Sequence, residues 1–336
     1  MPKTDSSSAT CLVTGGAGFI GSHLARRLVE LGHEVRIVDN LATGDRRNVE
    51  AVGGGAEFLL GDLCDPAVCA RAVDGVELVF HLAALGSVPR SLADAWGSHD
   101  ANVNATVRLL EAARAGGVRR VVYSSSSSVY GDTPTLPKIE TMEPLPRSPY
   151  AASKLSGEQY VLAYARAGLV EGVALRYFNV FGPRQSPTGP YAAVIPLFLR
   201  GARDGEPVVL FGDGEQTRDF TYVDNVVEAN VLAATGPAEK VSGWVANVGA
   251  GGRTSLNDVV ALVGRITGRP LDVQQRPPRG GDVRDSQASL ERARAVLGYE
   301  PRVGLEEGLR RTWEWFVNEP EETRPAAAAA AATKAS

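Results

Sequence analysis

Short β-rich runs alternate with amphipathic stretches along the first half of this chain. The runs that predict strands are residues 11–14, 34–38, 57–60, 77–82, 119–124 and 172–178. The helical patterns between them span residues 18–31, 96–115 and 150–167. Strands that alternate with helices in this order predict an α/β fold: a Rossmann-like, doubly wound parallel sheet with helices on both faces.

The character of the chain changes after residue 178, where turns rich in Gly and Pro become frequent and the elements between them become shorter. This change predicts two lobes. The larger one covers residues 1–178, with residues 217–249 partly returning to it, and the smaller α/β lobe covers residues 179–318. Residues 319–336 contain an alanine run of low complexity, and we expect them to carry no chemistry.

Composition and charge narrow the classes of protein that this chain can be. Apolar residues make up 44% and charged residues 22% of the 336 residues, which is typical of a globular protein. The formal net charge of -4 gives no general attraction to nucleic acid or anionic lipid, so we expect neither as a partner. There is no run of about 18 apolar residues, no signal-like start, and no metal-ligand spacing among the three cysteines. We therefore expect a cytoplasmic protein with reduced thiols, no membrane span and no metal site.

A glycine-rich turn separates the first predicted strand from the first predicted helix. The turn reads Gly15-Gly16-Ala17-Gly18-Phe19-Ile20-Gly21. Gly15 permits a tight turn, Gly18 lets the backbone approach a pyrophosphate, and Gly21 lets the helix pack closely on the sheet. Asp39 ends the second strand about 20 residues further on, where a carboxylate binds the adenosine ribose and repels a 2′-phosphate. The pattern predicts NAD binding, with Asp62 after the third strand as a candidate for the adenine edge.

A second motif, Tyr150-Ala151-Ala152-Ser153-Lys154, opens the last helix of the first lobe, which places Tyr150 and Lys154 one turn apart on one face. An ammonium beside a phenol lowers the phenol pKa from about 10, which yields a base near neutral pH. This spacing alone is common on ordinary helices. However, the strand at residues 119–124 runs into five serines, and hydroxyls at the carboxyl end of a parallel strand face the ligand crevice. One of them is expected to relay a proton to Tyr150.

These motifs resemble the extended short-chain dehydrogenase/reductases, in the branch that contains the nucleotide-sugar epimerases. The resemblance extends from residue 11 to about residue 315 and implies that Ser126, Tyr150 and Lys154 are catalytic. The NAD contacts that it implies are Gly15, Gly18, Phe19, Ile20, Gly21, Asp39, Asn40, Asp62, Leu63, Ala83, Ala84, Asn102, Tyr150 and Lys154. It also implies a homodimer that packs two long helices together near Ala105 and Tyr160.

The same resemblance implies a UDP-sugar substrate. The residues expected to bind it are Ser87, Ser126, Ser127, Ser128, Asn179, Val194, Arg218, Arg279, Asp282 and Ser286. The two arginines suit the pyrophosphate, because guanidinium groups fork onto phosphate oxygens. Related dehydratases and decarboxylases carry carboxylates where this chain has Ser127 and Ser128. The chain therefore lacks an obvious acid or base for eliminating water, which epimerisation does not need.

Several features bear on the identity of the sugar. The segments that resemble UDP-N-acetylglucosamine 4-epimerases are residues 87–91, 191–196 and 281–286. Ser286 stands where glucose-restricted epimerases have a tyrosine, which leaves space for a 2-acetamido group, whereas Arg90 and Arg284 suit a uronic acid. We expect an NAD-dependent 4-epimerase that interconverts UDP-N-acetylglucosamine and UDP-N-acetylgalactosamine through a 4-keto sugar. UDP-glucuronate 4-epimerase and UDP-glucose 4-epimerase are the alternatives within this class. An NAD-dependent nucleotide-sugar reductase or dehydrogenase, or a dinucleotide-sensing binding protein, represents other classes.

Overall fold

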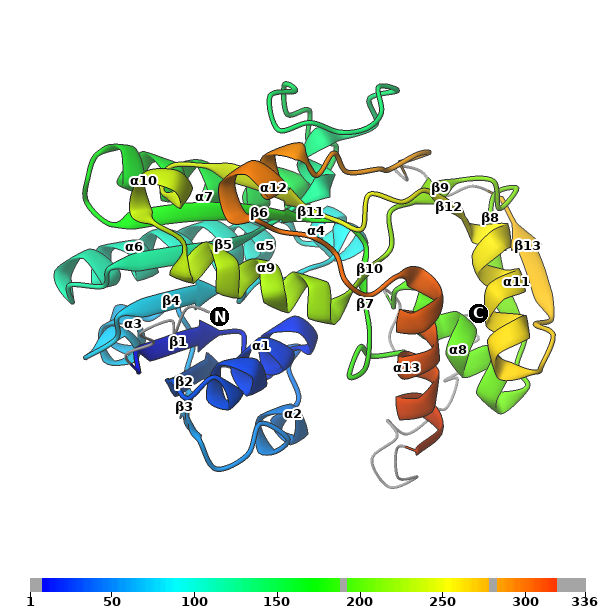
Figure 1. Cartoon of the computed structure of the whole chain (residues 1–336), viewed down its shortest axis with the longest axis horizontal. Helices are drawn as coiled ribbons and strands as arrows, with labels where there is room; N and C mark the ends of the chain where they lie inside the picture. The colour runs from blue at the N-terminus through cyan, green and yellow to red at the C-terminus, as the bar shows by residue number, and fades with distance from the viewer. Residues whose placement is uncertain (1–7, 188–191, 278–282, 319–336) are drawn as a thin grey trace, which may run out of the picture.

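A parallel sheet of seven strands forms the centre of the larger part of the molecule (Figure 1). The computed structural model describes residues 8–187, 192–277 and 283–318. The strands of the sheet are β1 (Thr10–Thr14), β2 (Glu34–Asp39), β3 (Ala56–Leu60), β4 (Leu78–His81), β5 (Arg120–Ser126), β6 (Glu171–Tyr177) and β11 (Val245–Val248). They lie in the order β11-β6-β5-β4-β1-β2-β3, and every neighbouring pair is parallel. The doubly wound α/β fold predicted from the sequence is confirmed.

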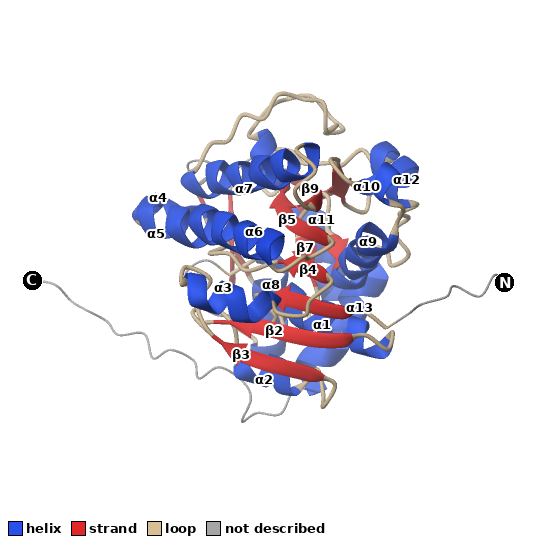
Figure 2. Cartoon of the chain, turned by 90° about the vertical axis from the view of Figure 1, so that its left-hand side faces the viewer, coloured by secondary structure: helices blue, strands red, loops and turns tan. Residues whose placement is uncertain are grey.

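Helices cover both faces of this sheet, as Figure 2 shows. The helices of one face are α3 (Pro66–Val73), α6 (Ala105–Ala115) and α7 (Pro149–Arg166), with α4 (Val88–Ala93) and α5 (Ala95–His99) beside α7. The helices of the other face include α1 (Phe19–Glu30) and α9 (Val223–Thr235), with the shorter α2 (Arg46–Glu50), α10 (Ala238–Val241) and α12 (Glu291–Leu297) around them. Within the described residues, no helix is long and apolar enough to cross a membrane.

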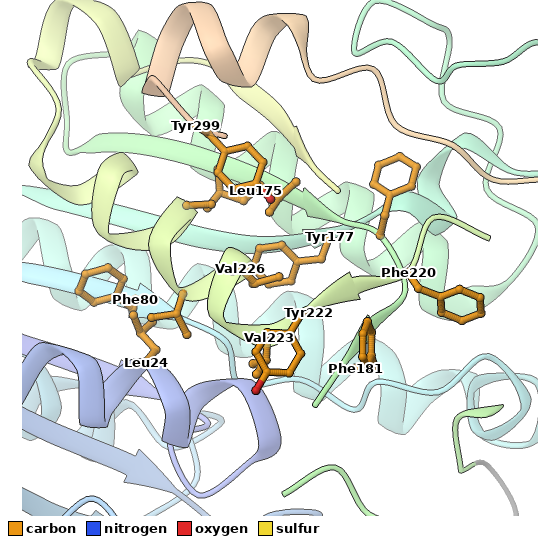
Figure 3. Close-up of a cluster of buried hydrophobic side chains, with 14 of the residues drawn as sticks. Leu24, Phe80, Leu175, Tyr177, Phe181, Phe220, Tyr222, Val223, Val226 and Tyr299 are labelled. Carbon is orange, nitrogen blue, oxygen red and sulfur yellow. The ribbon is translucent and has the colours of Figure 1, made fainter. Parts of the chain in front are cut away.

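The sheet is buried on both faces because successive side chains of a strand point to opposite sides. In β4, Leu78 and Phe80 belong to the core under α1 and α9, whereas Val79 belongs to the core under α3 and α6. Figure 3 shows the first of these cores, in which Leu24 of α1 and Val226 of α9 lie near the strand side chains. This packing holds the start of α1 against the carboxyl ends of the strands, where a ligand can bind.

The chain after β6 builds smaller elements beyond the carboxyl ends of the sheet strands (right in Figure 1). These elements are β7 (Val180–Phe181), α8 (Val194–Asp204), β8 (Val208–Phe211), β9 (Thr217–Arg218), β10 (Thr221–Tyr222), β12 (Thr254–Ser255), α11 (Leu256–Thr267), β13 (Val273–Arg276) and α13 (Leu305–Asn318). The short strands form the pairs β7-β10, β8-β13 and β9-β12. Between them, α9 and β11 return to the large sheet. The division into a larger and a smaller lobe stays a proposal.

The helix predicted over residues 96–115 is divided in the structure. After α5, a π-helical turn at Asp100–Asn104 precedes α6. The Thr106 hydroxyl donates to the backbone oxygen of Asn102 across this turn, at 2.7 Å. Hydrophobic periodicity did not indicate the turn, because a π-helical turn changes the helical register locally while leaving the apolar content of the segment unchanged.

Candidate active site

A cavity of about 1120 Å³ lies at the carboxyl ends of the sheet strands and is lined by residues of the sheet and of the elements after β6. This volume lies slightly above the roughly 300–1000 Å³ that is usual for a small-molecule pocket. The predicted site residues that line it are Gly15, Gly18, Phe19, Ile20, Gly21, Asp39, Asn40, Asp62, Leu63, Ala83, Ala84, Ser87, Ser126, Ser127, Ser128, Tyr150, Lys154, Asn179, Arg218 and Ser286. Asn102 and Val194 do not belong to the lining. Arg279 and Asp282 fall outside the described residues.

The glycine turn between β1 and α1 is shaped by contacts that leave no room for side chains. Gly15 has a φ of +70°, and a Cβ there would lie 2.7 Å from the backbone nitrogen of Ala83. A Cβ on Gly21 would lie 2.2 Å from the backbone oxygen of Gly15. Gly18 caps α1 without a side-chain hydrogen bond, so the first N–H groups of the helix are left for an anion in the cavity. The turn therefore fits a dinucleotide pyrophosphate.

Asp39 lies beside this turn at the end of β2. Its Oδ2 accepts a hydrogen bond from the Ala17 N–H at 3.0 Å, and its Oδ1 accepts one from the Leu41 N–H at 2.8 Å. Burial raises the pKa of the Asp39 carboxyl, and these two hydrogen bonds act in the opposite direction. Each carboxylate oxygen retains acceptor capacity for a ribose hydroxyl. Next to it, Asp62 Oδ2 accepts a hydrogen bond from Asn40 Nδ2 at 2.8 Å, which orders the strand ends around the predicted adenosine site.

Tyr150 lies at the start of α7, where the helix is fixed by its cap. The Ser148 hydroxyl oxygen accepts a hydrogen bond from the Ala151 N–H at 3.1 Å. Burial raises the pKa of the Tyr150 phenol, and a hydrogen bond with Ser126 opposes that rise. Ser126 Oγ accepts from Ser128 N at 3.2 Å and from Ser128 Oγ at 2.9 Å, so its own hydrogen is left for Tyr150. The two hydroxyls can thus relay a proton.

Lys154 lies one turn after Tyr150 and is only 3% exposed. Its Nζ lies 4.6 Å from the centroid of the Tyr123 ring, a distance at which the ring face attracts a cation. Burial lowers the pKa of the Lys154 ammonium to about 7, and the negative charge of Glu158 acts against this shift. An ammonium in this position stabilises a phenolate on Tyr150.

Buried hydrogen bonds lead from the glycine turn toward the catalytic helix. Thr14 Oγ1 accepts from the N–H groups of Leu82 and Ala83, both at 3.1 Å, so its hydrogen is directed to His81 Nδ1 at 2.8 Å. The proton of His81 therefore lies on Nε2, which donates to Thr106 Oγ1 at 2.8 Å. Burial lowers the pKa of His81 to about 3, which keeps the ring neutral.

Asn102 continues this chain inside the protein rather than at the cavity wall. It lies within the π-helical turn Asp100–Asn104, where its backbone oxygen accepts from the Thr106 hydroxyl, and it is 1% exposed. Its Oδ1 accepts from the Leu85 N–H at 2.7 Å, and its Nδ2 donates to Ser153 Oγ at 2.9 Å. Ser153 in turn donates to the backbone oxygen of Tyr150 at 2.8 Å. Asn102 thus ties the loop after β4 to the first turn of α7.

The residues predicted to hold the substrate are contributed largely by the later part of the chain. Arg218 Nη1 donates to the backbone oxygen of Thr217 at 2.9 Å, which orients the guanidinium at the cavity. The Ser286 N–H donates to the same oxygen at 3.1 Å, so both residues are fixed by β9. Asn179 lies between β6 and β7 with a φ of +31°, a backbone conformation in which asparagine is more common than most residues.

The two arginines that suggested a uronic acid differ in position. Arg90 in α4 lines the cavity. Arg284 is paired on the surface, where its two terminal nitrogens donate to the Asp213 carboxylate at 2.9 and 3.0 Å, and it does not line the cavity. Arg90 is therefore the one of the two that is placed to meet a ligand.

Sequence reasoning missed other residues of the cavity wall. Lys138 is 2% exposed and lines the cavity, and its Nζ donates to the hydroxyl of Thr133 at 2.6 Å. Gln185 also lines the cavity, with its Nε2 donating to the Val180 oxygen at 3.1 Å. The segment around Asn179 could have indicated Gln185. No local pattern marks Lys138, because it lies in the long segment between β5 and α7 and comes to the cavity only in the folded structure.

Comparison with known proteins shows which families this chain is similar to. Residues 11–249 match the NAD dependent epimerase/dehydratase family. A UDP-glucose 4-epimerase from Mycolicibacterium smegmatis is 42% identical over 91% of this chain and 98% of that protein. A UDP-N-acetyl-alpha-D-glucosaminuronate decarboxylase from Bacillus cytotoxicus is 36% identical over 91% of this chain and 97% of that protein.

Solved structures agree with these sequence matches. The UDP-N-acetylglucosamine 4-epimerase from Methanobrevibacter ruminantium, in complex with UDP-N-acetylmuramic acid, superposes with a TM-score of 0.88 at 38% identity. That match covers 94% of this chain and 100% of the other. The Thermus thermophilus UDP-glucose 4-epimerase in complex with NAD gives a TM-score of 0.85 at 38% identity, over 93% of this chain and 100% of the other.

Proposed function

We propose, from the premise that this chain belongs to the NAD dependent epimerase/dehydratase family, that it inverts carbon 4 of a UDP-N-acetylhexosamine. The observation that carries this proposal is the arrangement of Ser126, Tyr150 and Lys154 at one cavity. Beside them stand Ser127 and Ser128, hydroxyl residues that are unable to supply the carboxylate needed for elimination. The residues therefore favour removal and return of hydrogen at one carbon over loss of water or carbon dioxide.

The chain's residues fit NAD as the cofactor. The glycine turn offers backbone N–H groups to a pyrophosphate, and a Cβ at Gly15 or Gly21 would fill the space that the turn keeps open. Asp39 would bind the ribose hydroxyls and disfavour a 2′-phosphate. Tyr150 and Lys154 would lie along the nicotinamide half. When bound, NAD accepts a hydride from the sugar and returns it.

In the proposed reaction Tyr150 and Ser126 move the proton of the 4-hydroxyl. Ser126 hydrogen-bonds the reacting oxygen, and Tyr150 as phenolate takes the proton through it. The Lys154 ammonium stabilises that phenolate. Because the proton returns by the same route, the two hydroxyls serve both halves of the reaction.

Inversion also requires that the 4-keto sugar presents its opposite face while its UDP stays bound. Asn179 and Arg218 are the described residues that we propose for the diphosphate. Arg279 and Asp282 remain predictions from the sequence, since they fall outside the described residues. Tight polar contacts to UDP and looser contacts to the sugar allow the ring to rotate without release.

We assign the acetamido substrate on account of Ser286. Its side chain lines the cavity, and a serine leaves free the volume that a larger side chain would occupy. One observation favours a second candidate, UDP-glucuronate: Arg90 also lines the cavity and provides a cation for a carboxylate.

The direct test is interconversion of a UDP-sugar panel without added NAD. We expect UDP-N-acetylglucosamine and UDP-N-acetylgalactosamine to be interconverted by the protein as purified, because its bound cofactor is restored in each cycle. Preferential conversion of UDP-glucuronate would favour the second candidate. A requirement for added cofactor in equal amount to product would instead indicate a net dehydrogenase or reductase.

Replacing Ser286 by Tyr should act selectively on N-acetylated sugars. The added ring fills space beside the 2-substituent, so kcat/KM for UDP-N-acetylglucosamine should fall by about 10- to 100-fold, with a much smaller change for UDP-glucose. Steady-state kinetics on both substrates measure the effect, and Ser286→Ala is the matched control, which should spare both. Equal losses for the two sugars in Ser286→Tyr would refute the role of this position.

We further propose that two copies of the chain associate through α6 and α7 and the helices beside them. Leu92 of α4 is 61% exposed, Trp96 of α5 is 75% exposed and Tyr160 of α7 is 43% exposed. Exposed apolar groups on neighbouring helices are typical of an interaction surface. Light scattering should give twice the chain mass of 35.4 kDa, and Trp96→Glu should shift the population toward monomer. A monomeric wild-type protein at micromolar concentration would contradict this proposal.

A further inference from the structure

Glu158 is a fully buried carboxylate on the catalytic helix that the reaction as described does not use. It lies one turn after Lys154 and is 0% exposed. Its Oε2 accepts hydrogen bonds from Ser125 Oγ at 2.7 Å and from Arg176 Nε at 2.9 Å, and its Oε1 accepts one from Arg176 Nη2 at 2.7 Å. Glu158 is therefore paired inside the core with one guanidinium and one hydroxyl.

The partners of Glu158 come from two neighbouring strands. Ser125 of β5 and Arg176 of β6 are paired in the sheet register. Ser125 directly precedes Ser126, and Arg176 is 2% exposed with its guanidinium 4.7 Å from the centroid of the Tyr130 ring. Glu158 thus fastens the middle of α7 to the strand ends that carry the serine relay, and Arg176 holds the carboxylate in one orientation.

The surroundings of Lys154 explain why this carboxylate matters. From β5 the Tyr123 ring faces the ammonium at 4.6 Å, and from β4 comes His81, which is neutral. From α7 itself come Tyr150 and Glu158. Burial lowers the pKa of Lys154, and Glu158 provides the charge that opposes this. An ammonium that lost its proton would no longer stabilise a phenolate on Tyr150.

We propose that Glu158 is a positioning residue whose carboxylate, held by Ser125 and Arg176, keeps Lys154 in its ammonium form beside Tyr150. The consequence for catalysis rests on the proposed function, whereas the effect on Lys154 does not. Removal of the negative charge leaves burial unopposed. Lys154 then releases its proton at lower pH, and the alkaline limb of the rate profile moves in the same direction.

The test measures the protonation of Lys154 directly. The chain holds five lysines, so protein labelled with ¹³C and ¹⁵N at lysine gives few side-chain signals, and the Lys154 signal is identified by its loss in Lys154→Met. We expect Glu158→Gln to lower the titration midpoint of Lys154 by about one pH unit or more. The alkaline limb of the kcat profile should shift to lower pH by a similar amount. The conservative Glu158→Asp should keep both within a few tenths of a pH unit.

A second variant keeps the test decisive if Glu158→Gln does not fold. Glu158→Gln leaves Arg176 as a buried charge without its counter-ion, so the double variant Glu158→Gln/Arg176→Gln offers a neutral pair instead. Circular dichroism and NAD content show whether each variant is folded and loaded. Because the double variant also removes the positive charge of Arg176, it is compared with Arg176→Gln alone, and an equal Lys154 midpoint in these two folded variants would overturn the proposal. If the wild-type protein converts no UDP-sugar, the proposed function fails, yet the Lys154 titration still decides the role of Glu158.

Discussion

Replacing Tyr150 by Phe should lower turnover of the UDP-sugar by about 10²- to 10⁴-fold, the range in which a general base contributes. The ring remains at the start of α7, so the cap formed by Ser148 and the packing of the helix are unchanged. Only the phenol oxygen is lost, and with it the group to which Ser126 passes the proton. Coupled measurement of the 4-epimer and of NAD content separates lost chemistry from lost cofactor.

A matched control lies on the same helix. Tyr164 is 14 residues further along α7, about 21 Å away at the rise of a helix, and its hydroxyl contacts Glu111 at the surface. Tyr164→Phe removes the same atom without touching the cavity, so its turnover should stay within twofold of wild type. Unchanged turnover in Tyr150→Phe would remove Tyr150 as the base. Loss of NAD in that variant would instead make it a binding residue.

Gly21→Ala should largely abolish NAD binding. The added Cβ would lie 2.2 Å from the Gly15 oxygen and 2.8 Å from Gly16 Cα, both backbone atoms that cannot yield as a flexible side chain would. The start of α1 must move away from the turn, which removes the N–H groups from the pyrophosphate position. We expect the free energy of unfolding to fall by about 1–3 kcal/mol, as for an overpacked core. Bound NAD, measured after purification, should fall at least tenfold.

Gly54 provides the control for this substitution. A Cβ at that position would meet no atom within 4 Å, so Gly54→Ala should retain full NAD content and stability. If Gly21→Ala retained NAD at the wild-type level, the glycine turn would not be the pyrophosphate site. Chemical denaturation with and without added NAD distinguishes a weakened site from a weakened fold.

Local patterns in the sequence were sufficient for the sheet and the catalytic helix. The strand at residues 119–124 is found as β5, which continues to Ser126, and the helix at 150–167 is found as α7. Both depend on short-range information, namely β-branched residues in a run and a cap of Ser and Pro before an amphipathic stretch. The spacing of Tyr150 and Lys154 then follows from the helical repeat alone.

Contacts between distant residues account for what was missed. Asn102 was assigned to the site by the family resemblance alone, because its bonds to Leu85 and Ser153, 17 and 51 residues away, leave no trace in the local pattern. The position of Glu158 on the same helical face as Lys154, by contrast, could be predicted from the sequence, because the two are four residues apart. The role of Glu158 could not be predicted, because it depends on Arg176 from another strand.

Transfer of hydrogen from carbon 4 and back within one active site is the central claim, and isotopic labelling tests it directly. UDP-N-acetylglucosamine deuterated at carbon 4 is incubated with the purified protein in ordinary water without added NAD, and the epimer is analysed by mass spectrometry and NMR. We predict UDP-N-acetylgalactosamine that retains deuterium at carbon 4. An epimer carrying ordinary hydrogen at carbon 4 would show that the hydrogen came from solvent, and would contradict the account.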